Sequence, residues 1–143
     1  MRIGTRYVGP GSPCFIVAEC GLNHNGDLDT ALAMVRAAKK AEADAFKVQC
    51  FSADCFVRPG LKWQDKEQHA MFARHELARE DFRVIADECR DRGLIFFGTP
   101  DCERHASWLL EAGSPCLKVG SDDLTNTPLI RRLATLGVPL IIS

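Results

Sequence analysis

The chain has 143 residues, of which 46% are hydrophobic and 26% are charged, an ordinary globular composition that suffices for one domain with a buried core. Its 18 basic and 19 acidic residues are interspersed and give a formal net charge of -1, so charge offers no reason to expect nucleic acid or an anionic membrane as a partner. No segment approaches the ~20 apolar residues of a membrane span, and the start of the chain lacks the apolar core of a signal peptide, so we expect a cytoplasmic protein.

Short apolar runs alternate with segments of helical period along the chain. The runs expected as strands are CFIVAE (14–19), AFKVQ (45–49), LIFFGT (94–99), CLKVG (116–120) and PLIIS (139–143). Helices are expected at about 28–42, 79–92, 103–112 and 128–136, and the first two carry apolar stripes at i, i+3, i+4 and i+7. This alternation predicts an α/β fold with a parallel sheet.

Turn residues mark the ends of these helices. Gly93, Gly113 and Gly137 follow the last three helices as C′ residues, and Thr127 before Pro128 is expected as the N-cap of the last helix. The connection 52–78 is longer than the usual strand-to-helix loop, and a short helix is expected within QDKEQHAMFARH (64–75). Two interpretations of this connection stay open: a substrate lid, or a solvated excursion packed on the barrel rim by Trp63, Met71 and Phe72.

Five strands and four helices correspond to about the first four and a half units of a (β/α)₈ barrel, which typically needs about 250 residues. An open doubly wound sheet is the alternative, but the first strand-to-helix turn, ECGLNHNGD (19–27), lacks a G-x-G-x-x-G fingerprint. We therefore expect an incomplete (β/α)₈ TIM barrel.

Cysteine and histidine offer little sign of a metal site. The 7 cysteines include no C-x-x-C pair and are expected as free, mostly buried thiols. The 4 histidines are scattered, and we expect none of them to have a second histidine or cysteine at ligand spacing, so no metal ligands are assigned.

Two lysines lie inside apolar strand segments, and they are the strongest indication of a functional site. Burying an ammonium costs several kcal/mol unless it meets an anion or is deprotonated for chemistry. In a β/α barrel the chemistry gathers at the carboxyl ends of the strands, where residues two apart share a face. The polar residues expected to converge there are Glu19, Lys47, Gln49, Thr99 and Lys118, with Ser121 following the fourth strand.

Two ammonium groups near hydroxyls form a natural cradle for a phosphate or carboxylate, so we expect a small anionic substrate. Glu19 is interpreted as a general base or as a group that orients a sugar hydroxyl, the alternative being a structural ion pair with one lysine. Asn23 and His24 occupy a tight loop where they either bind substrate or only cap the next helix. Gln49 and Thr99 have structural interpretations as well. In these, Gln49 only bridges neighbouring strands, and Thr99 only satisfies a turn before Pro100.

Four segments taken together, in this order and spacing, resemble the N-terminal barrel of the sialic acid synthase (N-acetylneuraminate synthase) family. They are IVAECGLNHNGDLDTA, AFKVQCF, IFFGTPDCE and LKVGSDDLTNTPLI, and the resemblance spans nearly the whole chain. It implies that residues 1–143 are the N-terminal part of such a barrel, without the remaining strands and without the family's C-terminal antifreeze-like domain.

The resemblance implies a transferase that condenses phosphoenolpyruvate with an N-acetylmannosamine-type aldose, giving a nonulosonic acid and phosphate. By position, Lys47, Thr99, Lys118 and Ser121 would hold phosphoenolpyruvate, and Glu19 would transfer a proton near the sugar. Asn23 and His24 match the family's N-H loop, and Gln49 matches its K-x-Q strand. The family's divalent metal, manganese or magnesium, is bound by two histidines on later strands that this chain lacks, and its full-length members are expected as homodimers.

Three positions depart from the family pattern. Glu42 stands where a glycine is usual, Asp101 stands where an aromatic residue commonly follows T-P, and Asp122 replaces a glycine after Ser121. A carboxylate at position 122 would oppose a phosphate through like-charge repulsion.

Two other functions remain as alternatives. One is an aldolase that forms a Schiff base through Lys47 or Lys118, because a lysine desolvated in a barrel can become nucleophilic. The other is a non-catalytic half-barrel that assembles with a partner chain through its open edges.

Overall fold

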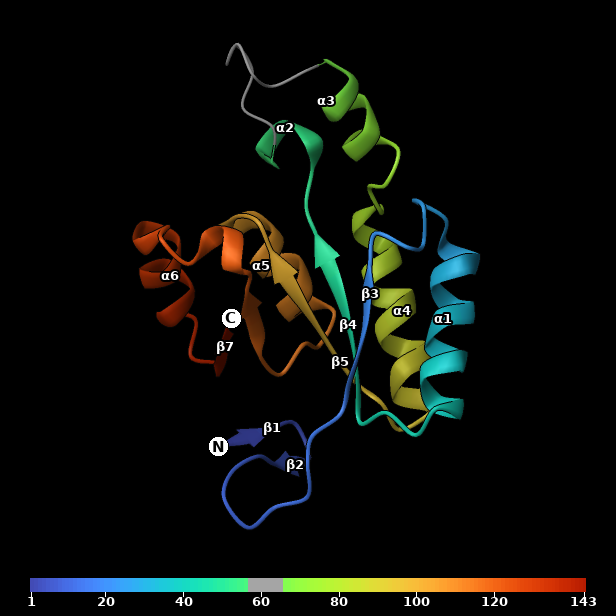
Figure 1. The fold of residues 1–143 in the computed structure, drawn as a ribbon, viewed down its shortest axis with the longest axis vertical. Coiled ribbons are helices and arrows are strands. Elements are labelled where there is room, and N and C mark those ends of the chain that lie inside the picture. Colours follow the sequence, from blue (N-terminus) through green and yellow to red (C-terminus); the bar gives the residue numbers. More distant parts are fainter. Residues whose placement is uncertain (57–65) are drawn as a thin grey trace.

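A short antiparallel hairpin opens the fold. The computed structural model describes residues 1–56 and 66–143, and its first elements are β1 (Arg2–Ile3) and β2 (Arg6–Tyr7). Gly4 between them has a φ of +54°, a conformation that glycine adopts without steric cost. The hairpin lies at the amino ends of the long strands (Figure 1). It is absent from the sequence-based prediction because two-residue strands are too short to show an alternating pattern.

A parallel sheet of five strands forms the centre of the molecule (Figure 1). Its strands lie side by side in chain order: β3 (Val17–Gly21), β4 (Ala45–Cys50), β5 (Ile95–Pro100), β6 (Leu117–Val119) and β7 (Leu140–Ile142). The first predicted strand, at 14–19, lies too early, because pairing with β4 begins only at Val17 and continues through an irregularity to Gly21. The sequential parallel order confirms the predicted α/β class, that of the first half of a (β/α)₈ barrel.

Helices cover the outer face of this sheet. They are α1 (Leu28–Lys40), α4 (Arg79–Asp91), α5 (Glu103–Glu111) and α6 (Thr127–Ala134), each within two residues of its predicted bounds. Asp27 caps α1 by accepting the N–H of Thr30 at 2.7 Å. The predicted cap of α6 is wrong: Asn126 is the N-cap, and its side chain accepts the N–H of Leu129, so Thr127 is the first helical residue.

Two apolar clusters hold the sheet in place. The larger one fills the space between the sheet and the helices and includes Phe46, Val48, Phe82, Ile85 and Leu109. The smaller one lies on the inner face and joins Ile3 of the hairpin to Ala45, Phe97 and Cys116. Alternate residues of each strand therefore enter different clusters, which confirms the predicted parity of the strands.

The long connection between β4 and α4 contains two short helices, α2 (Ala53–Phe56) and α3 (Lys66–Ala73). The short helix predicted within 64–75 is thus confirmed as α3, while its first two predicted residues and Trp63 lie outside the described residues. Phe72 of α3 contacts Phe51 edge to face, with ring centroids 5.8 Å apart. Glu76 accepts the N–H of Ala53 at 2.6 Å, so the two ends of the connection are tied to each other.

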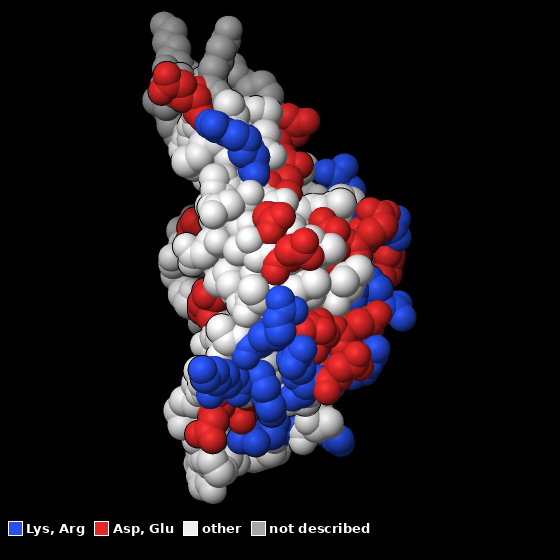
Figure 2. All heavy atoms as spheres, turned by 90° about the vertical axis from the view of Figure 1, so that its right-hand side faces the viewer, with Lys and Arg blue, Asp and Glu red and all other residues white. Residues whose placement is uncertain are grey.

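The outer helices carry charges of both signs. Arg36 of α1 pairs with Glu88 of α4, which also accepts from Arg92, and Figure 2 shows basic and acidic groups as neighbours on this face. Within the described part of the chain, none of the helices is long and apolar enough to cross a lipid bilayer.

Candidate active site at the carboxyl ends of the strands

A buried ammonium group is the centre of the candidate site. The Nζ of Lys47 on β4 lies 2.9 Å from a carboxylate oxygen of Glu19 on β3, and it donates to Oγ1 of Thr99 on β5 at 3.3 Å. The side chain of Lys47 is 4% exposed, whereas that of Glu19 is 54% exposed. The structure therefore brings together three of the predicted residues, from three adjacent strands.

The neighbours of Lys47 compensate only part of the free energy that burying its ammonium group costs. An ammonium has three N–H donors, and Glu19 and Thr99 accept two of them among the described residues. Water reaches the half-exposed Glu19 and weakens its attraction for the ammonium. An anionic ligand at the mouth can therefore accept a hydrogen bond from the third N–H of Lys47 and compete with Glu19 for the ammonium.

A small pocket borders this group and contains Gln49. Its volume is about 40 Å³, and its lining combines residues at the ends of β4 and β5 with residues of the loops above them: Leu22, Gln49, Phe51, Phe72, Thr99, Pro100, Asp101, Asp122 and Asp123. Gln49 is the register partner of Thr99, so its amide lies on the same strand edge as the Lys47 group. Phe72 contributes to the lining, which places the long connection at the rim of the candidate site.

Lys118 and Ser121 lie at the far side of the mouth. The Nζ of Lys118 donates to Oγ of Ser143 at 2.9 Å, and Ser121 is exposed at the start of a 3₁₀ turn, Ser121–Asp123. No hydrogen bond between described residues joins Lys118 to the Glu19, Lys47 and Thr99 group. A ligand that used both lysines would have to bridge the mouth.

Asp122 folds back over the preceding glycine. A Cβ built on Gly120 would lie 2.2 Å from Oδ1 of Asp122, so only glycine leaves room for the carboxylate in this position. The same carboxylate lines the small pocket beside Thr99. Residue 122 therefore adds negative charge where the sequence predicts an anion.

The first loop places Asn23 and His24 differently from the strand residues. Asn23 donates through Nδ2 to the carbonyl of Cys20 at 3.0 Å, and His24 is fully buried, with Nδ1 accepting the N–H of Gly26 at 3.0 Å. Burial lowers the pKa of His24, and the nearby His75 lowers it further. Both side chains thus make hydrogen bonds within the loop, and the alternative that they cap the next helix is wrong, because Asp27 is the N-cap of α1. Their part in substrate binding stays a prediction.

Seven free thiols are present, as predicted. Four of them are buried, and burial raises the pKa of Cys20 to about 11 and those of Cys89 and Cys116 to about 12. These protonated thiols act as small apolar groups in the core.

One cluster of chemically active side chains was not predicted. Asp101, Cys102 and His105 meet at the start of α5, and the expectation that no histidine has ligand spacing to a cysteine is wrong for this pair. The C-x-x-H spacing of Cys102 and His105 could have indicated the cluster from the sequence, because residues three apart share the face of a helix. This signal was weak because the spacing begins at a helix cap, where helical periodicity has not yet started.

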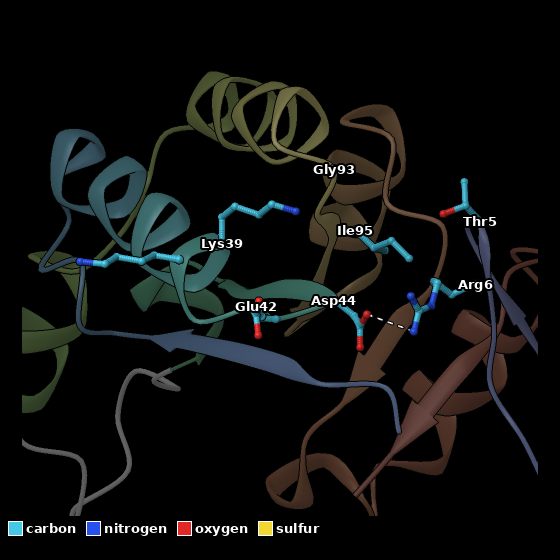
Figure 3. A pocket seen from close by; sticks show the side chains of 9 residues that line it. Thr5, Arg6, Lys39, Glu42, Asp44, Gly93 and Ile95 are labelled. Atoms are coloured by element: carbon cyan, nitrogen blue, oxygen red, sulfur yellow. Dashed lines mark ion pairs between the residues drawn. The ribbon is translucent and has the colours of Figure 1, made fainter. Parts of the chain in front are cut away.

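A second, wider pocket lies at the opposite end of the sheet (Figure 3). Its volume is about 600 Å³, and Lys39, Glu42, Asp44 and Gly93 are among its lining residues. Arg6 of the hairpin pairs with Asp44 at 3.1 Å across this pocket. Because active sites of β/α barrels lie at the carboxyl ends of the strands, we assign this end to stability.

The described residues at the mouth do not supply the two histidines by which the resemblance implies that its divalent metal is bound. Lysine ammonium groups have no lone pair to offer a metal, and the nearest loop histidine, His24, is buried with its Nδ1 occupied.

Comparison with known proteins shows that the chain is similar to sugar acid synthases. The model of the NeuB family matches residues 34–143. The N,N'-diacetyllegionaminic acid synthase of Legionella pneumophila is 35% identical over 98% of this chain and 42% of that protein. The N-acetylneuraminate-9-phosphate synthase of Homo sapiens is 35% identical over 96% of this chain and 41% of that protein.

A solved structure gives the same result. The N-acetylneuraminic acid (sialic acid) synthetase of Leptospira borgpetersenii, crystallised in complex with citrate, superposes with a TM-score of 0.91 at 30% identity. The match covers 99% of this chain and 48% of that one. The chain spans about two fifths of the length of these two curated relatives.

Proposed function

The chain belongs to the NeuB family, and from this premise we propose that it supplies the phosphoenolpyruvate-binding half of a sialic acid synthase-like transferase. The reaction proposed is condensation of phosphoenolpyruvate with an N-acetylmannosamine-type aldose to give a nonulosonic acid and inorganic phosphate. One observation carries the proposal: a nearly buried ammonium, Lys47, lies between a carboxylate and a hydroxyl at the carboxyl end of the sheet.

The anion would be held by cationic and hydroxyl groups on adjacent strands. Lys47 offers its remaining N–H donor, and Thr99 offers a hydroxyl on the same edge. Lys118 and Ser121 lie across the mouth and would take the other end of a molecule that carries both a phosphate and a carboxylate. The side-chain amide of Gln49 would donate a hydrogen bond to the bound molecule, between the Lys47–Thr99 pair and the Lys118–Ser121 pair.

The proposed reaction forms one carbon–carbon bond and breaks one carbon–oxygen bond. Carbon three of the enol ester attacks the sugar aldehyde, whose oxygen takes up a proton. Water then adds at carbon two and loses a proton, and the bond between carbon two and the phosphate oxygen breaks to release phosphate. Glu19 is half exposed beside Lys47, so it can exchange protons with substrate and solvent, and we assign it the proton transfer near the sugar.

The complete activity is proposed for a protein in which these residues are joined by the rest of a barrel. The relatives matched are more than twice the length of this chain, which covers 41% and 42% of them. Sugar recognition and the metal implied by the resemblance are accordingly assigned outside the residues described above.

The Schiff-base alternative is less well supported by the geometry at Lys47. A carboxylate at 2.9 Å stabilises the ammonium form, and an ammonium has no lone pair with which to attack a carbonyl. Borohydride treatment in the presence of pyruvate separates the two mechanisms. A reduced adduct on either lysine would support the aldolase and contradict the proposal.

The non-catalytic alternative has one observation in its favour. Ile16 beside β3 and Ile142 of β7 are each half exposed, and these strands form the two edges of the sheet. Light scattering on the purified chain tests the idea, because a monomer at micromolar concentration would count against assembly through the edges.

Hydrogen exchange with mass spectrometry tests the proposed site directly. Addition of phosphoenolpyruvate should slow amide exchange at the carboxyl ends of β4, β5 and β6 and in the turn Ser121–Asp123. Slower exchange only around the opposite pocket, which includes Lys39 and Gly93, would contradict the proposal. Inorganic sulfate is the control for binding of any divalent anion.

A further inference from the structure

Three different metal-binding groups meet at the first turn of α5. One carboxylate oxygen of Asp101 contacts Nδ1 of His105, and Sγ of Cys102 lies 3.2 Å from the same nitrogen. The ligand atoms of all three residues lie within 4.8 Å of one another. The side chain of His105 is 0% exposed and that of Asp101 is 7% exposed, so the cluster is closed on the protein side.

The geometry argues against a nucleophilic cysteine. In a nucleophile–histidine–carboxylate relay, the nucleophile and the carboxylate bind opposite nitrogens of the imidazole. Here both face Nδ1, and Nε2 is buried without a hydrogen-bond partner among the described residues. Burial also raises the pKa of Cys102 to about 11, the reverse of an activated thiol. Three donor atoms around one point form a chelate instead.

We propose that Asp101, Cys102 and His105 bind a zinc-class divalent transition metal and leave its fourth position open. Thiolate, imidazole and carboxylate are the donors that zinc prefers, at about 2.3 Å for sulfur and about 2.0 Å for nitrogen. These lengths give a sulfur–nitrogen edge of about 3.5 Å in a tetrahedral site, close to the 3.2 Å separation observed. On binding, the thiol releases its proton to solvent, and the carboxylate and imidazole move apart to admit the ion.

Charge and anchoring support the assignment. One thiolate and one carboxylate neutralise the dication, so the buried site carries no net charge. The second oxygen of Asp101 accepts the N–H of Ser52 at 3.4 Å, which links the carboxylate to the residues that follow β4. The ring of His105 packs edge to face against Trp108, with centroids 4.6 Å apart, which limits the orientations that the imidazole can adopt.

This site differs from the one that the family resemblance implies. Magnesium and manganese prefer oxygen ligands, whereas the sulfur of Cys102 favours zinc or cobalt. Asp101 also lines the small pocket beside Thr99, so the metal would lie next to the proposed substrate site.

Cobalt absorption tests the proposal, because Co²⁺ bound by sulfur in a tetrahedral site gives an intense charge-transfer band and visible d–d bands. The wild-type chain with Co²⁺ alone should show both, and an equivalent of Zn²⁺ should abolish them while excess Mg²⁺ does not. Cys102→Ser should lose the charge-transfer band and weaken Zn²⁺ binding at least about tenfold. Serine is a favourable N-cap residue, so this variant of the α5 N-cap should stay folded.

Cys14→Ser is the matched control, because Cys14 is an exposed thiol outside the cluster, and this variant should keep the full spectrum. The proposal is overturned if the folded wild-type chain shows no sulfur-to-cobalt band. An undiminished band in Cys102→Ser, with circular dichroism showing a native fold, would overturn it equally.

Discussion

The carboxylate of Glu19 lies 2.9 Å from the ammonium of Lys47, and the two side chains differ widely in exposure, at 54% and 4%. Loss of the partner would therefore affect the two side chains differently. Water can solvate Glu19 if its partner is removed, whereas Lys47 would remain buried, with Thr99 as its remaining hydrogen-bond acceptor among the described residues. The site holds a cation whose charge is only partly compensated by the protein.

The two halves of this pair should differ in their effect on stability. Glu19→Ala should lower the free energy of unfolding by about 1–2 kcal/mol, less than the about 3–5 kcal/mol of a fully buried pair because water reaches the site. Lys47→Met should cost less than about 1 kcal/mol, because an apolar side chain of similar volume replaces a buried charge. Urea unfolding measures both, and a larger loss for Lys47→Met than for Glu19→Ala would contradict the account.

The departure at Glu42 should have a cost in stability. Glu42 has a φ of +58°, and the left-handed conformation costs a side-chain-bearing residue roughly 1–2 kcal/mol. Glu42→Gly removes that strain, and after the entropy lost by glycine the net gain should be about 0.5–1 kcal/mol. The midpoint of urea unfolding should rise accordingly.

Glu42→Ala separates strain from charge. Alanine keeps the Cβ and the strained conformation but removes the carboxylate, so its midpoint should stay close to that of the wild type. An equal rise in both variants would assign the effect to charge in the pocket of Figure 3 instead.

Asp122 should weaken binding of an anion at the mouth. Its carboxylate lines the pocket beside Thr99, and Asp122→Asn removes the charge without changing its shape. Phosphoenolpyruvate should bind several-fold more tightly to this variant, and the difference should shrink in high salt because the site is open to solvent. Asp91→Asn, at the exposed end of α4, is the control, and it should leave affinity unchanged.

The buried His24 should make stability depend on pH. Burial lowers the pKa of His24 in the folded chain below its ordinary value of 6.5. Below that value the unfolded chain takes up a proton that the folded chain does not, so the free energy of unfolding falls as pH falls from about 7 toward 5. Titration of His24 alone contributes at most about 1.4 kcal/mol per pH unit to the slope of the free energy of unfolding against pH.

His24→Asn should flatten this slope, because asparagine can still accept the N–H of Gly26 but does not titrate. His69→Asn removes an exposed histidine on α3 and should keep the fall in stability at low pH. Unfolding curves at several pH values supply the comparison. An unchanged slope in His24→Asn would show that other groups set the pH dependence.

Much of the fold could be predicted because its elements are long enough to show a period. The apolar residues of α1 and α4 recur at helical spacing, and a buried lysine stands out in β4 because charges are rare there. Parity along the strands then placed Glu19, Lys47 and Thr99 on one face, where the structure joins them.

The elements that were missed depend on contacts between short or irregular segments. The hairpin at Gly4 has no period, and its place is set by packing of Ile3 against the inner face of the sheet. The cap at Asn126 was assigned to Thr127 because both residue types favour that position. The cluster at His105 needs a carboxylate that precedes the helix, and helical spacing says nothing about that residue.

Calorimetric titration of the purified chain with phosphoenolpyruvate tests whether Lys47 and Lys118 hold this anion at the carboxyl ends of the strands. The wild-type chain should bind phosphoenolpyruvate, Lys47→Met and Lys118→Ala should each lose at least about tenfold in affinity, and Lys39→Met in the opposite pocket should bind as the wild type does. Equal affinity in all four proteins, or no binding by a folded wild-type chain, would contradict the account.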